Sequence, residues 1–117
     1  MRMWMLPPVV LCRQHLLGEH YELHMQVGTI IAGRSIAGWV RDGFIDPYRA
    51  AERHAELVIE MRSRGMNHKS PLPLFSVPRL GHLRPCVDIA RNYRELAERC
   101  GRCRLRIEEY EHAMASL

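Results

Sequence analysis

The sequence predicts a compact, single-domain, all-α fold of about three to four helices, with the N-terminal segment packed against them. Three observations lead to this prediction. The 117 residues are the length of one domain, and the apolar content of 47% is ordinary for a globular protein. Apolar side chains recur with helical rather than strand periodicity along most of the chain. No repeat, low-complexity tract or linker divides residues 1–117.

The first part of the chain is expected to hold one long and one short helix. Residues 1–11 are apolar and contain two adjacent prolines, which predicts an extended lead-in or an early helix start. A long helix is expected over 12–31, and Gly33 is its stop signal. A short helix is expected over 35–40. A core-facing helix therefore follows directly on the N-terminal segment.

The middle of the chain predicts a further helix with clear start and stop signals. Asp46 can cap free amides, and Pro47 at the first helical position loses no hydrogen bond. This helix should continue to Arg64, where Gly65 provides a C-terminal cap.

The last part of the chain predicts a long loop and two helices. Residues 67–85 contain four prolines, and we expect them to form a surface loop. A loop of this length is unusual in a compact domain and hints at function. Helices are expected over 87–100 and from 104 to the C-terminus.

The charge is positive and unevenly distributed. The formal net charge is +4, and eight arginines face only three acidic residues between positions 79 and 106. A basic stretch of this kind suits a phosphate-facing surface, although an arginine-rich solvated face is the alternative. No apolar run approaches the roughly 18–20 residues that span a bilayer, and no secretory signal is recognisable. A cytoplasmic protein without a membrane partner is expected.

The basic residues also restrict amine chemistry. All 17 are arginines except Lys69. An arginine side chain does not deprotonate and cannot act as an amine nucleophile. Any amine chemistry would therefore use Lys69 or the α-amino group of Met1.

A polar stripe follows one face of the first long helix. His15, Glu19, Glu22 and Gln26 share this face at spacings of three or four residues, beside an apolar face. The stripe can be a functional site or simply the solvated side of an amphipathic helix. The pattern alone leaves both interpretations open.

Four cysteines are expected to be reduced thiols, because no secretory signal is present. Cys100 and Cys103 form a Cys-x-x-Cys pair. Zinc binding would need two further ligands, for example Cys86 with Cys12, or a histidine such as His82. Zinc, a redox pair and partly buried thiols all remain open, and neither a metal nor a cofactor is assigned.

The segment RQHLLGEHYEL, residues 13–23, resembles the first-helix motif of the phage pyrimidine-dimer DNA glycosylases known as endonuclease V. The family pattern is Gln-His-Leu, two residues, and then Glu-x-x-Glu-Leu. ELVIEMRSRGMN, residues 56–67, resembles the family's central helix, and a fainter similarity surrounds VDIARNYRELAERC. The resemblance covers about half of the chain, and the first block is its specific part.

This resemblance implies an all-α fold and two activities. The family cleaves the N-glycosidic bond of a damaged pyrimidine and then nicks the backbone by β-elimination. Its nucleophile is the N-terminal amine, which here belongs to Met1, because a residue as large as Arg2 normally leaves the initiator methionine in place. The catalytic carboxylate corresponds to Glu22. The supporting residues implied are Arg2, beside the amine and near a flanking phosphate, and Gln14 and His15, near the DNA. Glu19 could orient His15 or have no chemical role.

The chemistry explains why these groups are needed. An attacking amine must be unprotonated, and an α-amine has a reference pKa of about 7.7–8.0 against about 10.4 for lysine. It can form a Schiff base with the sugar. A carboxylate stabilises the positive charge that develops on the sugar and can move the protons of ring opening and elimination.

Two departures from the phage pattern concern substrate recognition. Tyr21 and Met25 stand where the phage proteins carry arginines, and CGRCRLRI replaces an aromatic-basic run near the C-terminus. Cleavage at abasic sites could persist even if recognition of pyrimidine dimers has changed. The expected partner is double-stranded DNA with damaged or abasic nucleotides, bound by a monomer without cofactor or metal.

Backbone contacts to this DNA are expected from one group of basic side chains. Its members are Arg13, Lys69, Arg79, Arg84, Arg91, Arg94, Arg102 and Arg104. The alternatives to an enzyme are a non-catalytic nucleic-acid-binding helical module and a small zinc-binding or protein-interaction domain.

Overall fold

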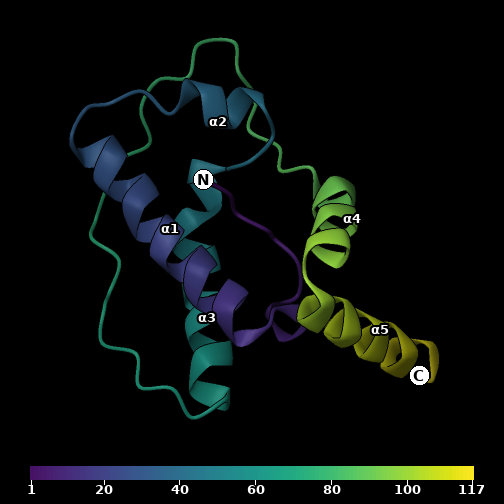
Figure 1. Ribbon diagram of the computed structural model, residues 1–117. Coiled ribbons are helices and arrows are strands. Elements are labelled where there is room, and N and C mark those ends of the chain that lie inside the picture. Colours follow the sequence, from purple (N-terminus) through teal and green to yellow (C-terminus); the bar gives the residue numbers. More distant parts are fainter.

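The computed structural model describes residues 1–117 and contains helices but no strands (Figure 1). The all-α fold class is therefore confirmed. The elements in chain order are the 3-10 helix η1 (Pro8–Val10), α1 (Arg13–Ile31), α2 (Ala37–Arg41), the 3-10 helix η2 (Pro47–Arg49), α3 (Ala50–Ser63), α4 (Ile89–Arg99) and α5 (Gly101–Ala115). No helix combines the length and the apolar content needed to cross a membrane.

The helices form two groups around the N-terminal segment. Helix α1 packs beside α3, and α4 packs against α5, which extends away from the body of the molecule (Figure 1). The N-terminal segment, purple in Figure 1, passes between these two groups. This arrangement brings the chain start to the middle of the fold.

Local signals explain most helix boundaries in the first half. The long helix ends where expected, and Gly33 follows with a φ of 74°, in the left-handed region that favours glycine. The Asp46 carboxylate accepts a hydrogen bond from the Tyr48 amide at 3.0 Å, as expected of a cap. The turn that follows is a 3-10 helix, so α3 itself begins only at Ala50. Gly65, with a φ of 80°, terminates it as expected.

The second half confirms the long loop and shifts two helix starts. No helix or strand lies between α3 and α4. Asp88 caps α4 by accepting a hydrogen bond from the Arg91 amide at 3.0 Å, so α4 starts two residues later than expected. Helix α5 starts three residues earlier than expected, because Cys100 acts as its N-cap through a 3.4 Å contact between its Sγ and the Cys103 amide.

The N-terminal segment supplies much of the core. Met3, Leu6, Val10 and Leu11 are each at most 1% exposed, and they join apolar residues from every long helix. Burial of such side chains is the main stabilising contribution to a fold of this size. The N-terminal segment is therefore part of the core and not a loose extension.

Side chains satisfy the backbone of this segment, since it has no strand partner. Apart from the hydrogen bonds of its own turns, the segment makes one backbone hydrogen bond to the rest of the fold. The Met3 amide donates it to the Phe44 carbonyl at 2.8 Å. Buried carbonyl groups without a partner would be costly. Four side chains provide the partners, namely Arg53 to Leu6, Arg64 to Pro8 and Leu11, Arg106 to Val9, and Asn92 to Met3 and Trp4.

Candidate active site

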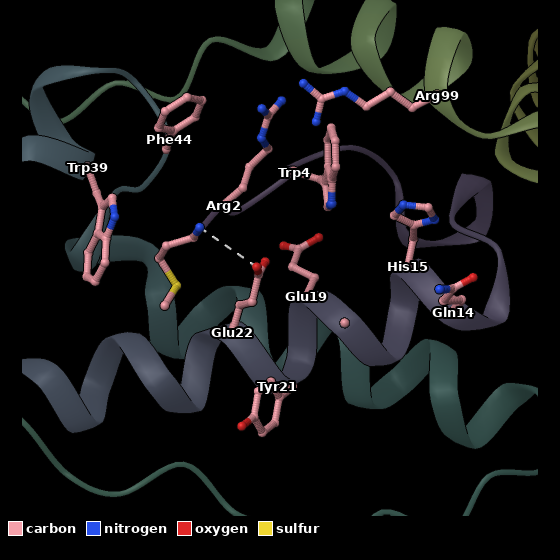
Figure 2. A pocket seen from close by; sticks show the side chains of 12 residues that line it. Arg2, Trp4, Gln14, His15, Glu19, Tyr21, Glu22, Trp39, Phe44 and Arg99 are labelled. Carbon is pink, nitrogen blue, oxygen red and sulfur yellow. Dashed lines mark ion pairs between the residues drawn. The ribbon is translucent and has the colours of Figure 1, made fainter.

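A pocket of about 530 Å³ lies between the N-terminal segment and the first half of α1 (Figure 2). Trp39 and Phe44, from the region around α2, and Arg99 of α4 complete its wall. All six residues that the resemblance assigned to the site line this pocket, namely Met1, Arg2, Gln14, His15, Glu19 and Glu22.

The chain start faces a carboxylate in this pocket. The Met1 α-amino nitrogen lies 3.8 Å from Oε1 of Glu22, which projects from α1 toward it (Figure 2). The Met1 side chain is only 6% exposed, whereas the Glu22 side chain is 34% exposed. The buried methionine side chain anchors the amine, and the carboxylate remains reachable from the solvent. This distance is that of an ion pair slightly longer than a hydrogen bond, so direct proton transfer requires a small movement of the Glu22 side chain toward the amine.

Arg2 holds the chain start in place through internal contacts. Its guanidinium lies over the rings of Trp4 and Phe44, at 4.5 and 4.8 Å from the ring centroids. It also forms an ion pair with Glu95 and donates a hydrogen bond to Asn92 Oδ1 at 3.0 Å. These contacts indicate a positioning role for Arg2. Both polar contacts use Nη1, so the expectation that Arg2 also contacts a flanking phosphate stays a prediction.

Asn92 of α4 is a site-supporting residue that the sequence analysis missed. Its side chain is fully buried and donates to the carbonyls of Met3 at 3.2 Å and Trp4 at 2.9 Å. It thereby connects the Arg2 guanidinium to the backbone of the N-terminal segment. A polar residue four positions before the buried Leu96, on the apolar side of α4, was the available signal.

Glu19 has a structural environment that differs from the expected one. Its carboxylate is fully buried and accepts two hydrogen bonds from Arg53 of α3, at 2.6 and 2.9 Å. Burial raises the pKa of the Glu19 carboxyl, and the Arg53 guanidinium acts in the opposite direction. No hydrogen bond joins Glu19 to His15, so of the two roles considered for Glu19 the structure favours the one without a chemical part, and Glu19 pairs with Arg53 instead. Glu22 is the other acidic residue in the pocket wall, and it is the accessible one.

His15 lies between the pocket and a group of cysteines. Its Nδ1 is 3.2 Å from Cys12 Sγ and 3.5 Å from Cys103 Sγ. The edge of its ring meets Trp4 at a centroid distance of 6.0 Å. Burial lowers the pKa of His15, while the charge of Glu22 acts in the opposite direction. The imidazole is therefore favoured in its neutral form.

The predicted DNA-binding side chains fall into two groups. Arg91 donates to the carbonyls of Asp42 and Gly43, each at 2.8 Å, and lies over the Phe44 ring at 4.4 Å. Its guanidinium is thus used within the fold, which corrects the expectation that Arg91 contacts the DNA backbone. The exposed members are Arg13, Lys69, Arg79, Arg84, Arg94, Arg102 and Arg104.

Arg99 belongs to the basic stretch expected to face phosphate, but its place in the pocket wall was not predicted. Its side chain is 61% exposed and lies 3.5 Å from Glu95. Its position at the end of α4, directly before the Cys100 cap, could not be related to the pocket without the fold.

The helical fold, with an amine and a carboxylate facing each other in an open pocket beside exposed arginines, is an architecture suited to a DNA-repair glycosylase. The family model described as pyrimidine dimer DNA glycosylase matches residues 1–74, and the chain belongs to this family. The matched part contains α1 to α3 and every pocket residue except Arg99. Neither the curated proteins nor the solved structures gave a significant match.

Proposed function

We propose that the protein is a DNA glycosylase and abasic-site lyase that acts through a Schiff base on the Met1 amine. Its substrates would be double-stranded DNA with damaged pyrimidines, pyrimidine dimers among them, or with abasic sites. One observation carries the proposal, namely the 3.8 Å approach of the Met1 nitrogen to Glu22 at the wall of an open pocket. Family membership supplies the glycosylase class and DNA as the substrate.

The proposed reaction begins with the neutral amine. It attacks C1′ of the damaged nucleotide, the bond from C1′ to the base breaks, and the base leaves with the electron pair and takes up a proton. At an abasic site, water leaves instead. The amine then loses a proton, the bond from C1′ to O4′ opens, and O4′ is protonated, which gives an imine.

Strand cleavage follows from the imine. Removal of a proton from C2′ expels the 3′ phosphate and breaks the C3′–O bond. Water then hydrolyses the imine and restores the free amine. Glu22 is the proposed acceptor and donor of these protons, and its negative charge stabilises the cationic sugar.

Several features support a single-chain enzyme for distorted DNA. Every group in the proposed reaction lies on one chain, so a monomer suffices. Trp39 and Phe44 give the pocket apolar walls next to the amine, as a nucleotide taken out of the stack would require. Tyr21 is 64% exposed at the rim, where a flanking base could stack on it.

The test is borohydride trapping on duplexes with an abasic site and, in parallel, on ultraviolet-irradiated duplexes. The wild-type protein should form a covalent adduct with the abasic duplex and nick it. Glu22→Gln should slow single-turnover nicking by about 10²- to 10⁴-fold, because it removes the proton-transferring group. Glu108→Gln, an exposed position on α5, is the matched control and should leave the rate unchanged.

Two outcomes would contradict the proposal. If the wild-type protein bound DNA but formed no adduct, a non-catalytic nucleic-acid-binding module would be favoured. If Glu22→Gln nicked as fast as Glu108→Gln, the carboxylate would have no part in the reaction. Adducts on abasic DNA alone, without glycosylase products from irradiated DNA, would limit the function to the lyase step.

A further inference from the structure

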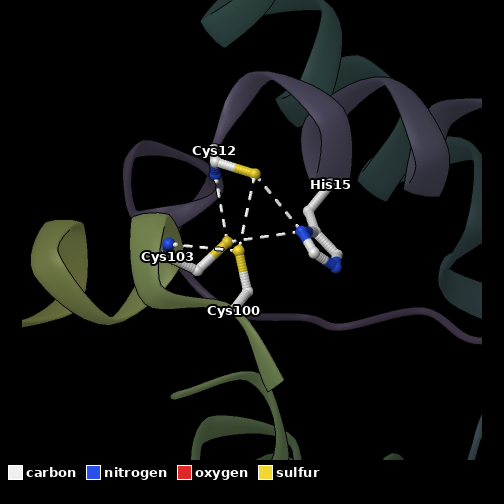
Figure 3. Close-up of side chains that lie close together, drawn as sticks. All are labelled: Cys12, His15, Cys100 and Cys103. Carbon is white, nitrogen blue, oxygen red and sulfur yellow. Dashed lines mark hydrogen bonds between the residues drawn. The ribbon is translucent and has the colours of Figure 1, made fainter. Parts of the chain in front are cut away.

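Two short motifs from opposite ends of the chain meet in the fold. Cys12 and His15 lie three residues apart at the start of α1, and Cys100 and Cys103 lie three residues apart at the start of α5. Cys-x-x-His and Cys-x-x-Cys have the spacing of zinc-binding half-sites. Figure 3 shows the four side chains pointing toward one common point.

The distances between these side chains match a single tetrahedral metal ion. Cys12 Sγ lies 3.2 Å from His15 Nδ1 and 3.9 Å from Cys100 Sγ, and Cys103 Sγ lies 3.5 Å from the same nitrogen. All four ligand atoms lie within 4.8 Å of one another. Bonds of about 2.3 Å to sulfur and about 2.0–2.1 Å to nitrogen place neighbouring tetrahedral ligand atoms about 3.5–3.8 Å apart. A [4Fe–4S] cluster, in which each ligand binds a different iron, or a [2Fe–2S] cluster, in which two pairs of ligands bind two irons, would need a wider separation between ligands on different irons.

Backbone amides are placed to orient metal-bound thiolates. The Cys12 amide donates to Cys103 Sγ at 3.2 Å, and the Cys103 amide is 3.4 Å from Cys100 Sγ. Such N–H to sulfur contacts form the outer shell that orients metal-binding thiolates. Both half-sites also lie at helix N-termini, where the free amides favour negative charge. Cys12 and Cys103 are at most 5% exposed, which protects this arrangement from solvent.

We propose that Cys12, His15, Cys100 and Cys103 bind one structural Zn²⁺ ion. Four protein ligands complete the tetrahedron, so the site is closed and its role is structural. The three thiols release their protons on binding. Of the partners that the sequence offered to the Cys-x-x-Cys pair, Cys12 belongs to the cluster, whereas Cys86 and His82 do not.

The ion would connect the start of α1 to the start of α5. Helix α5 packs on α4 and on the short η1, and the proposed zinc adds a bond to the start of α1, beside the pocket. Coordination through Nδ1 of His15 leaves the ring proton on Nε2 and fixes the ring orientation. The inference does not depend on the proposed enzymatic function, since it concerns the integrity of the fold.

The first test is metal analysis of the full-length protein, purified under reducing conditions without chelator. We expect one zinc per chain. Cys103→Ser and Cys100→Ser should each lower the zinc content well below one, whereas Cys86→Ser, at an exposed cysteine outside the cluster, should retain it. A chelator strong enough to remove the ion should lower the melting temperature of the wild-type protein and of Cys86→Ser alike.

A second test uses the wild-type protein, in case a variant fails to fold. Replacement of the ion by Co²⁺ should give the visible d–d bands of a tetrahedral site together with a thiolate-to-cobalt charge-transfer band. Any one of three results would overturn the proposal. These are a wild-type protein that neither contains nor takes up zinc, a cobalt spectrum without thiolate bands, and a metal-free protein with a disulfide between Cys12 and Cys100.

Discussion

The Arg53 guanidinium is almost completely buried, yet each of its nitrogens has an acceptor. Nε and Nη2 donate to Glu19, while Nη1 donates to the Leu6 carbonyl at 2.7 Å and to Glu56 at 3.0 Å. One side chain of α3 thus binds both α1 and the N-terminal segment. These two elements carry Glu22 and the Met1 amine, so Arg53 helps to hold the two groups in their relative positions.

Replacement of this arginine should be strongly destabilising. Arg53→Met leaves the Glu19 carboxylate buried without a partner, and we expect the free energy of unfolding to fall by about 3–5 kcal/mol. Urea denaturation measures this change. The double variant Arg53→Met with Glu19→Leu removes both charges and should recover much of the loss. Arg49→Met breaks an exposed pair with Glu52 and should cost no more than about 1 kcal/mol. A loss in Arg53→Met no larger than that of Arg49→Met would refute the supporting role.

Some residues of the candidate site could be predicted from the sequence, and others could not. Met1 and Glu22 were predicted because a local motif fixes the position of the carboxylate, and the scarcity of lysine draws attention to the terminal amine. Arg53 and Asn92 were missed because their partners lie far away in the chain. A charged or amide side chain on an apolar helix face suggests burial but does not identify the partner.

At the scale of elements, α1 and α3 also meet through histidines. His20 of α1 has ring centroids of three other histidines within 5 Å, at 4.8 Å for His54 and 4.9 Å each for His24 and His68. Burial, followed by repulsion from these three residues, lowers the pKa of His20 to about 4. Burial likewise lowers the pKa of His54. Both rings therefore pack in their neutral form.

This packing predicts a loss of stability in mild acid. The folded-state pKa of His20 lies below its ordinary value of 6.5, so its contribution is fully present above about pH 6.5 and is lost as the pH falls toward 4. The melting temperature should decrease over this window. His20→Asn should flatten the decrease, whereas His112→Asn, at an exposed position on α5, should not. Equal pH profiles for the wild-type protein and His20→Asn would show that the histidine contact does not govern acid stability.

The sequence predicted which helices exist better than where they start. Periodicity and the Gly33 stop fixed the end of α1, and the long proline-containing loop was recognised by its composition. The start of α5 was placed three residues late, because a cysteine is not a usual N-cap. Its cap contact depends on the cluster that Cys100 forms with side chains from the other end of the chain.

At the scale of the whole molecule, the arginines serve two purposes. Some bind carbonyl groups and carboxylates inside the fold, and the structure shows this for Arg2, Arg53, Arg64 and Arg91. Others are exposed and available to an anionic partner. Net charge therefore overstates the number of arginines that can contact DNA, and only the structure separates the two groups.

DNA affinity should reflect this separation. Arg94→Gln and Arg102→Gln remove exposed charges on α4 and α5, and each should lower the slope of log affinity against log salt by about 0.9 if it loses one phosphate contact. Fluorescence anisotropy over a salt series measures this slope. Arg62→Gln, at a position on α3 that is also exposed, should leave it unchanged. If Arg62→Gln lowered the slope as much as the other two variants, the DNA surface would lie elsewhere.

The fold class was predictable because helical periodicity is a local property of the sequence. The passage of the N-terminal segment between the two helix groups was not, since it depends on contacts of Met3, Trp4 and Leu6 with residues about 40 to 90 positions away. That passage brings the terminal nitrogen to Glu22, and the proposed chemistry depends on it.

Peptide mapping of the borohydride-reduced DNA adduct tests this chemistry most directly. After nuclease and protease digestion, the mass of the reduced sugar should be found on the α-amine of Met1 in the N-terminal peptide. Lys69→Arg should give the same adduct in the same yield. Finding the sugar on Lys69, with an unmodified N-terminal peptide, would contradict the assignment of the terminal amine as the nucleophile.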